Sequence, residues 1–203
     1  MPLTGGRLCA VAVWGEPPLP LLRKTGDKLF RYDGCEIYAK YKTDLSETVL
    51  KKINFENAQL KGAYFNCAQL QDAYFVGAQL QSAAFVNAQL QSAVFVDAQL
   101  YDAKFFSTKL QGAKLRNTEL QDAVFTCVQL QDANFTGAQL YNAKFEYAEL
   151  EGADFTGVYN IDKVIFKNIS WNKETNFKKT AFENKTIEVL TKIMNNPPTL
   201  LDK

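Results

Sequence analysis

The sequence predicts a solenoid of short extended segments and tight turns, and three observations support this prediction. Every fifth residue from Phe55 to Phe155 is Leu or Phe without a gap, which gives twenty-one central positions. The residue two places before each centre is Ala in seventeen of these twenty-one cases. A period of five fits neither an α-helix, where apolar residues recur every three or four positions, nor a β-strand, where they alternate. The backbone must therefore bend once in every five residues.

The centres and the small residues before them form the expected core. An extended step followed by a bend brings successive Leu and Phe side chains to a common axis, and the Ala two places earlier also points inward. A single coil cannot bury these residues, so the stacking of neighbouring coils must hold the fold together. The Leu/Phe alternation lapses once, at Leu115, and four small positions hold larger residues: Ile53, Thr108, Thr118 and Val128.

The repeating blocks resemble those of a known family. From residue 68 they read AQLQD-AYFVG-AQLQS-AAFVN, each with a small residue, a polar residue, a central Leu or Phe and two polar or turn-forming residues. Over residues 43–160 this pattern is similar to that of pentapeptide-repeat proteins. The resemblance implies an all-β fold, a right-handed quadrilateral β-helix with four pentapeptides in each coil. Positions twenty residues apart would then stack on one face, with Leu on two opposite faces and Phe on the other two.

We expect three parts of the chain. Residues 1–42 do not follow the repeat and are interpreted as an N-terminal arm or cap. The β-helix is expected over residues 43–177, and residues 178–203 are interpreted as a C-terminal helical cap and tail.

The end of the repeat region departs from the pattern. After Phe155 the register slips by one residue, which we attribute to a loop at residues 157–162, and one partial coil follows. An amphipathic helix is predicted at residues 186–194, with its apolar face over the open end of the column. Such a cover is expected because an open coil exposes unpaired backbone groups and an apolar layer.

The residues for catalysis or metal binding are mostly missing. The chain has no His, which is the commonest general base and metal ligand, and it has no P-loop, dinucleotide-binding, zinc-protease or EF-hand motif. Cys67 and Cys127 should lie three coils apart, on the order of 14 Å by strand spacing, which is too far for a disulfide. The sequence is compatible with a disulfide between Cys9 and Cys35. We therefore expect a protein that is not an enzyme, with no cofactor and no metal site.

Polar residues flank the Leu centres and occupy the turns. Tyr101 and Tyr141 interrupt one polar face, and they are interpreted first as ordinary packing and second as surface contacts. Recurring acids at turn positions are interpreted as turn formers: Asp72, Asp102, Asp122 and Asp132. Pairs of Gln should form hydrogen-bonded ladders between coils: Gln69 and Gln71, Gln79 and Gln81, Gln89 and Gln91, and Gln129 and Gln131.

Apolar residues flank several Phe centres and form the candidate interaction surface. One group should point outward from adjacent coils of one face: Tyr74, Val76, Val94 and Val96. A second group is expected on the opposite face: Tyr64, Val86 and Phe106. Contiguous exposed apolar surface usually marks a contact. Two interpretations are open, namely that the N-terminal arm folds back over one group, or that a partner protein or a second copy binds there.

The function that the sequence favours is a non-catalytic protein-interaction scaffold. The alternative comes from the family resemblance, because some pentapeptide-repeat proteins resemble DNA in shape and charge and bind type II topoisomerases such as gyrase. Mimicry of DNA requires a strongly acidic rod. Residues 55–155 contain eleven acidic and six basic residues, and a basic belt lies in the middle of the rod: Lys104, Lys109, Lys114 and Arg116. This modest acidic excess and the belt argue against mimicry.

Other classes of partner have less support in the sequence. Basic residues near the termini are scattered among acids, which does not favour direct nucleic-acid binding. No apolar run approaches the length of a membrane span, and the short apolar stretch at residues 8–14 lacks a convincing signal-peptide cleavage site. We expect a cytoplasmic protein without a membrane partner.

Overall fold

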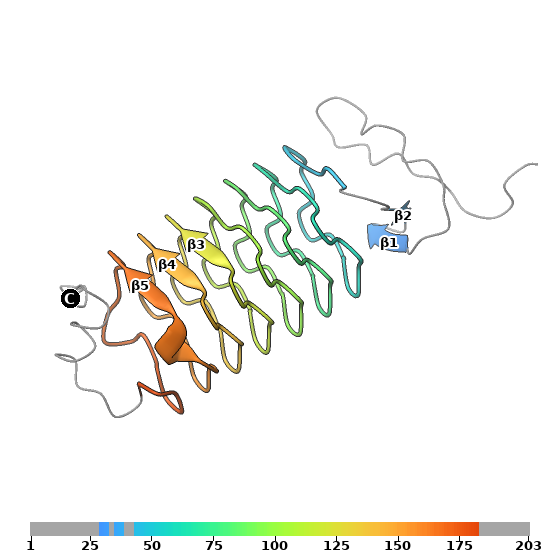
Figure 1. Ribbon diagram of the computed structural model, residues 1–203. Helices are drawn as coiled ribbons and strands as arrows, with labels where there is room; N and C mark the ends of the chain where they lie inside the picture. Colours follow the sequence, from blue (N-terminus) through green and yellow to red (C-terminus); the bar gives the residue numbers. More distant parts are fainter. Residues whose placement is uncertain (1–28, 33–34, 39–42, 183–203) are drawn as a thin grey trace, which may run out of the picture.

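The repeat region forms a four-sided rod of stacked coils in the computed structural model, which describes residues 29–32, 35–38 and 43–182 (Figure 1). Parallel bridges join residues that are twenty positions apart, from Asp44–Tyr64 to Gln139–Tyr159. Each of these bridging residues except Tyr159 stands directly before a centre, so every coil lies in register on the next. This stacking confirms the β-helix with four pentapeptides per coil.

Four columns of buried centres define the four faces of the rod. Face 1 contains Leu45, Phe65, Phe85, Phe105, Phe125, Phe145 and Phe166. Face 2 contains Leu50, Leu70, Leu90, Leu110, Leu130, Leu150 and Trp171. Face 3 contains Phe55, Phe75, Phe95, Leu115, Phe135, Phe155 and Phe177. Face 4 contains Leu60, Leu80, Leu100, Leu120, Leu140, Ile161 and Phe182. The seven centres of each face number the coils 1 to 7. Bridges join coil 7 to coil 6 on faces 1, 2 and 3, and Phe182 lies against the rings of Phe166 and Phe177.

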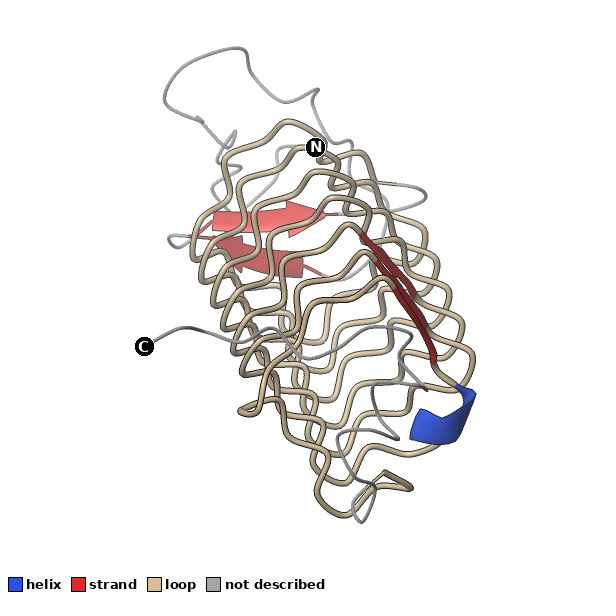
Figure 2. Ribbon diagram, turned by 90° about the vertical axis from the view of Figure 1, so that its left-hand side faces the viewer, coloured by secondary structure: helices blue, strands red, loops and turns tan. Residues whose placement is uncertain are grey.

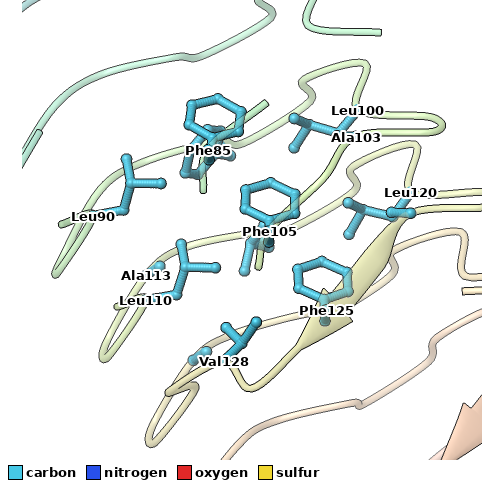
Figure 3. Packing of buried hydrophobic residues seen from close by; sticks show 14 of the residues in the cluster. Phe85, Leu90, Leu100, Ala103, Phe105, Leu110, Ala113, Leu120, Phe125 and Val128 are labelled. Atoms are coloured by element: carbon cyan, nitrogen blue, oxygen red, sulfur yellow. The ribbon is translucent and has the colours of Figure 1, made fainter. Parts of the chain in front are cut away.

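The Phe residues form two stacked columns that fill the rod. The ring of Phe105 lies 5.0 Å from Phe85 and 4.8 Å from Phe125, with interplanar angles of 2° and 1° (Figure 3). The columns of faces 1 and 3 meet edge to face, as between Phe85 and Phe95, at 6.0 Å and 89°. Both geometries are favourable for aromatic pairs. The Ala residues two places before the centres are also buried, and their small size lets the columns approach one another.

Two of the larger residues at the small positions are polar and nevertheless buried. Thr108 donates its hydroxyl to the carbonyl of Phe85 at 2.6 Å, and Thr118 donates to the carbonyl of Leu115 at 2.7 Å. These bonds matter because a buried hydroxyl without a partner is costly. Leu115 itself stands between Phe95 and Phe135 and interrupts the Phe column of face 3.

Each bend places one residue in the left-handed region of backbone space. From residue 47 to residue 157, every residue two places after a centre has a φ between 52° and 70°. Many bends also carry a turn hydrogen bond, such as that from the N–H of Ala58 to the carbonyl of Phe55 at 3.0 Å. This combination is typical of type II turns, which suit Gly and Asn. The expected turn positions, including the recurring Asp residues, are therefore confirmed.

The slip after Phe155 is confirmed and has a local cause. The 3₁₀-helix η1, Ile161–Lys163, follows Asn160, which has a φ of 58°. The extra residue makes the next bridge, Lys144–Ile165, span twenty-one positions instead of twenty. Phe166 still stacks on Phe145, at 5.4 Å.

A second insertion lies in the last coil and was not predicted. The bridge Asp154–Asn176 spans twenty-two positions. The extra residue belongs to a loop in which Asn172 Oδ1 accepts hydrogen bonds from the N–H groups of Glu174 and Thr175, at 3.0 and 3.1 Å. Thr175 also donates its hydroxyl to the carbonyl of Leu150 at 2.9 Å, so the buried polar groups of this loop are bonded to the coil before it.

On face 1 the bridges lengthen into three short parallel strands (Figure 2). These are β3 (Val124–Thr126), β4 (Lys144–Glu146) and β5 (Ile165–Lys167), in the order β3-β4-β5. Before the rod, β1 (Leu29–Tyr32) and β2 (Cys35–Tyr38) form an antiparallel pair within the part interpreted as an N-terminal arm.

Some expectations concern residues outside the described part of the chain. The helix predicted at 186–194 lies there, and so does Cys9 with its possible disulfide to Cys35. The rest of the N-terminal arm before residue 29 also lies there.

Replacing Phe105 by Ala should lower the free energy of unfolding by about 3–5 kcal/mol, because a fully buried ring is lost from the middle of a stack. Phe106 is the matched control, since it is adjacent in sequence but 38% exposed, and Phe106→Ala should cost much less. Urea-induced unfolding followed by circular dichroism measures both changes. Equal losses for the two variants would contradict this account of the core.

Candidate interaction surface

The residues directly before and directly after each centre face outward along the flat sides of the rod, and the turn residues face outward at its corners. The columns of the residues before and after the centres are the surface that a partner would contact, because the centres and the small residues are buried. The bridges join the residues before the centres, while hydrogen bonds from the turn residues connect the residues after the centres.

The first group of the candidate surface is contiguous on face 3. Tyr74 and Val94 form a bridge, and the N–H of Gly77 donates to the carbonyl of Val96 at 2.9 Å, which places Val96 beside Val76. Tyr74 is 48% exposed, and the three valines are half-buried. We call these four residues of coils 2 and 3 the face 3 patch.

Charged residues border the face 3 patch at both ends, which the sequence analysis did not note. The N–H of Asn57 donates to the carbonyl of Val76 at 2.8 Å, so Glu56 precedes Val76 in the outward column. At the other end Arg116 follows Val96 in the same column, and Lys114 follows Val94 through a bridge. Glu56, Lys114 and Arg116 are all exposed. Because residues twenty positions apart are neighbours on one face, the sequence alone could have predicted that these charged residues border the patch.

The second group is less continuous on face 1. Val86 and Phe106 are successive in one column, since the N–H of Asn87 donates to the carbonyl of Phe106 at 2.9 Å. Tyr64 lies in the other column and bridges Ala84. Asn66, which precedes Val86, accepts a hydrogen bond from the Val86 N–H on its side-chain oxygen at 3.1 Å. Polar and small residues thus separate Tyr64 from the other two side chains.

An ion pair lies beside Phe106 on face 1. Lys104 Nζ is 2.5 Å from Asp102 Oδ1, and Ser82 donates its hydroxyl to Asp102 Oδ2 at 3.0 Å. The hydrogen bond from Lys104 is the main cause that holds the pKa of Asp102 below its ordinary value, with a smaller contribution from Ser82 and an opposing one from burial. Lys104 is therefore the one member of the basic belt with an acidic partner among the described residues.

The predicted Gln ladders are confirmed in part, and their hydrogen bonds run diagonally. Among the described residues four Gln–Gln bonds form, whereas Gln131 donates to Glu149 and Gln91, with Lys109 eighteen residues after it, makes no such bond. In each Gln–Gln bond, the amide after one centre donates to the oxygen before the next centre of the same face: Gln71 to Gln89 (2.7 Å), Gln81 to Gln99 (2.6 Å), Gln111 to Gln129 (2.8 Å) and Gln121 to Gln139 (2.8 Å). This diagonal step spans eighteen residues. The same step leads from Tyr141 to Tyr159, which are 46% and 63% exposed and end the polar ladder of face 4.

Few features of the described residues suggest chemistry. Cys67 and Cys127 are free, exposed thiols at turn positions of separate coils. A shallow depression on face 2 is lined by four carboxylates, from Asp132, Glu149, Glu151 and Glu174. Within the described residues, no three Cys, Asp or Glu side chains are arranged to hold a metal ion. No helix in this part of the chain is long and apolar enough to cross a membrane.

Two family models match the rod that these residues form. One, described as pentapeptide repeats in eight copies, matches residues 41–75, and the other, described as a pentapeptide repeat region, matches residues 78–155. Together the matches cover more than half of the 203 residues. The chain belongs to the pentapeptide-repeat family. Proteins of this family are generally non-enzymatic structural or interaction proteins.

Solved structures of several pentapeptide-repeat proteins are similar to the chain. HetL from the cyanobacterium Nostoc, which is involved in the regulation of heterocyst differentiation, is 23% identical, with a TM-score of 0.38 and 68% of each chain covered. Rfr23 from the cyanobacterium Cyanothece is also 23% identical, with a TM-score of 0.44, covering 66% of this chain and 91% of its own. QnrB1, a plasmid-mediated fluoroquinolone resistance protein, is 18% identical, with a TM-score of 0.37, covering 80% and 94%. No curated protein matches the chain.

Replacing Lys104 by Gln should raise the pKa of Asp102 toward its ordinary value, because the main hydrogen bond to the carboxylate is lost. A folded-state pKa that is lowered stabilises the fold above the unfolded pKa, and this contribution disappears as the pH falls through the folded pKa. The variant should therefore lose less stability on acidification than the wild type. NMR titration of the Asp102 carboxyl measures the shift, and Lys114→Gln, on another face, is the control that should leave it unchanged.

Proposed function

We propose that the chain is a non-catalytic scaffold that binds another protein through the face 3 patch. The observation that carries this proposal is the contiguity of Tyr74, Val76, Val94 and Val96 in two adjacent coils, at positions that the backbone hydrogen bonds fix. Contiguous exposed apolar surface of this kind usually marks an interaction site. The aromatic side chain at its edge is typical of residues that dominate binding energy.

The second group, Tyr64, Val86 and Phe106, is a weaker candidate for the same role. Asn66 and Ala84 interrupt its apolar surface. We therefore assign the first contact of a partner to face 3 and keep face 1 as a secondary surface.

Affinity capture with the immobilised full chain tests the scaffold. Wild type should retain a protein from an extract of the native host, and Val76→Lys/Val96→Lys should retain at least tenfold less, because two charges replace the apolar centre of the contact. Thr136→Lys/Thr156→Lys, in the same column but in coils 5 and 6, is the matched control for added charge. Equal capture by all three proteins, each folded by circular dichroism, would reject face 3 as the binding surface.

DNA mimicry is the alternative function, and the placement of the basic belt argues against it. Lys104, Lys109, Lys114 and Arg116 all belong to coil 4 and occupy faces 1, 2 and 3. All but Lys104 are exposed, and Lys104 is half-buried. A protein that imitates the regular negative charge of a phosphate backbone would not place cations around its middle.

A gyrase supercoiling assay distinguishes the two functions. The scaffold proposal expects no inhibition and no protection from a quinolone at micromolar protein. A variant with the belt removed, Lys109→Glu/Lys114→Glu/Arg116→Glu, should also be inactive. Inhibition or protection by the wild type would establish the alternative instead.

We also propose a cytoplasmic location and a partner that is neither a membrane nor a nucleic acid. Both described cysteines outside the strands are free and exposed, which suits a reducing compartment. The face 3 patch is apolar and is bordered by charges of both signs, whereas nucleic-acid sites are dominated by basic residues.

A further inference from the structure

We propose that the partner of the face 3 patch is a second copy of this chain, bound in an antiparallel, two-fold symmetric pair. The inference rests on the proposed function, since it uses the same patch, and it specifies the partner and the register. Its basis is the order of residues along the two outward columns of face 3.

The two columns have a self-complementary order over coils 1 to 4. One column runs Asn54, Tyr74, Val94 and Lys114, joined by bridges. The other runs Glu56, Val76, Val96 and Arg116, joined by backbone hydrogen bonds of 2.8, 2.9 and 3.0 Å. Two apolar coils therefore stand between a coil with an acidic residue and a coil with two basic ones.

In an antiparallel pair, each column faces the same column of the second copy in the reverse order. A two-fold axis that lies in the plane of face 3, perpendicular to the rod and between coils 2 and 3, places coil 1 of one copy against coil 4 of the other. Glu56 then faces Arg116 of the second copy, twice by symmetry, while Val76 faces Val96 and Tyr74 faces Val94. Interfaces between identical subunits are usually of this isologous type. The apolar residues meet at the centre and the opposite charges meet at the rim.

The alternative parallel arrangement is electrostatically unfavourable. A two-fold axis along the rod would place each coil against the same coil of the second copy. Lys114 would then face Arg116, and Asn54 would face Glu56, so like charges would meet in coil 4 with no acid opposite them. Like charges across an interface suppress the wrong arrangement.

The size of the contact predicts a weak dimer. Four coils at about 4.8 Å each give a contact about 19 Å long, which is small beside the roughly 800 Å² that each partner buries in a standard interface. We expect a dissociation constant on the order of 10–1000 μM, in the range of weak and transient contacts. The dimer would therefore form and separate as the protein concentration changes.

Charge reversal tests both the partner and the register. Sedimentation velocity of the full chain should show a concentration-dependent monomer–dimer equilibrium. Glu56→Arg alone and Arg116→Glu alone should each weaken the dimer roughly tenfold, because two like-charged contacts replace two ion pairs. An equimolar mixture of the two variants, and the variant that carries both changes, should restore it, since opposite charges face each other again.

The controls distinguish a wrong inference from an unfolded variant. Thr136→Lys/Thr156→Lys, outside coils 1 to 4, should dimerise like the wild type, and circular dichroism should be the same for all variants. A wild type that is monomeric up to millimolar concentration would overturn the inference, and so would a dimer in which the mixture of single variants shows no recovery. If the monomeric chain still captures another protein in a manner that depends on Val76 and Val96, the scaffold function stands without self-association.

Discussion

The left-handed bend in every pentapeptide is the constraint on which the rest of the structure depends. From residue 47 to residue 157, the second residue after each centre has a positive φ, including residues such as Cys67 and Tyr147 that gain nothing from this conformation by themselves. The fold tolerates this backbone strain because each bend returns the next centre to the axis. There Phe and Leu stack on their counterparts one coil away. Burial and backbone geometry therefore support each other at every fifth residue, and the outward positions are fixed as a consequence.

The division between inside and outside separates stability from recognition. The inward positions hold Ala, Leu and Phe almost throughout, whereas the outward ones vary from Gln to Val, Lys and Tyr. The ladder on faces 2 and 4 shows that outward residues can also stabilise the rod, through diagonal amide bonds such as Gln71–Gln89. In the face 3 patch Tyr and Val side chains stand at these positions, and they have no amide to offer a neighbouring coil. The outward residues of the patch therefore add no side-chain hydrogen bonds between coils, and they are the ones with the clearest capacity to bind a partner.

The repeat region could be predicted from the sequence because its interactions recur at fixed spacings along the chain. Positions twenty apart must meet, so the faces, the turns and the slip after Phe155 followed from counting. The second insertion could not be predicted by counting positions. Asn172 and Thr175 bury polar groups there and satisfy them through hydrogen bonds, which a pattern of apolar residues does not reveal. The pair β1–β2 was missed although Asp33-Gly34 between the two strand sequences is a strong hairpin signal. The continuity of the Tyr64 group was overestimated because the side chain of Asn66 bonds to the backbone beside Val86.

Coil 4 shows how far the exterior is independent of the interior. Its core departs from the pattern in three places, with Leu115 in the Phe column and with Thr108 and Thr118 at small positions. Its exterior also departs, because the basic belt lies there. The backbone register nevertheless continues through it, since Lys114 bridges Val94 on one side and Asn134 on the other. The distance between the basic residues and the face 3 patch is therefore set by the backbone ladder and not by the packing beneath it. Because the same ladder sets the place of Glu56, the spacing of the two charges across the patch is a property of the fold, while their identity is a property of this sequence.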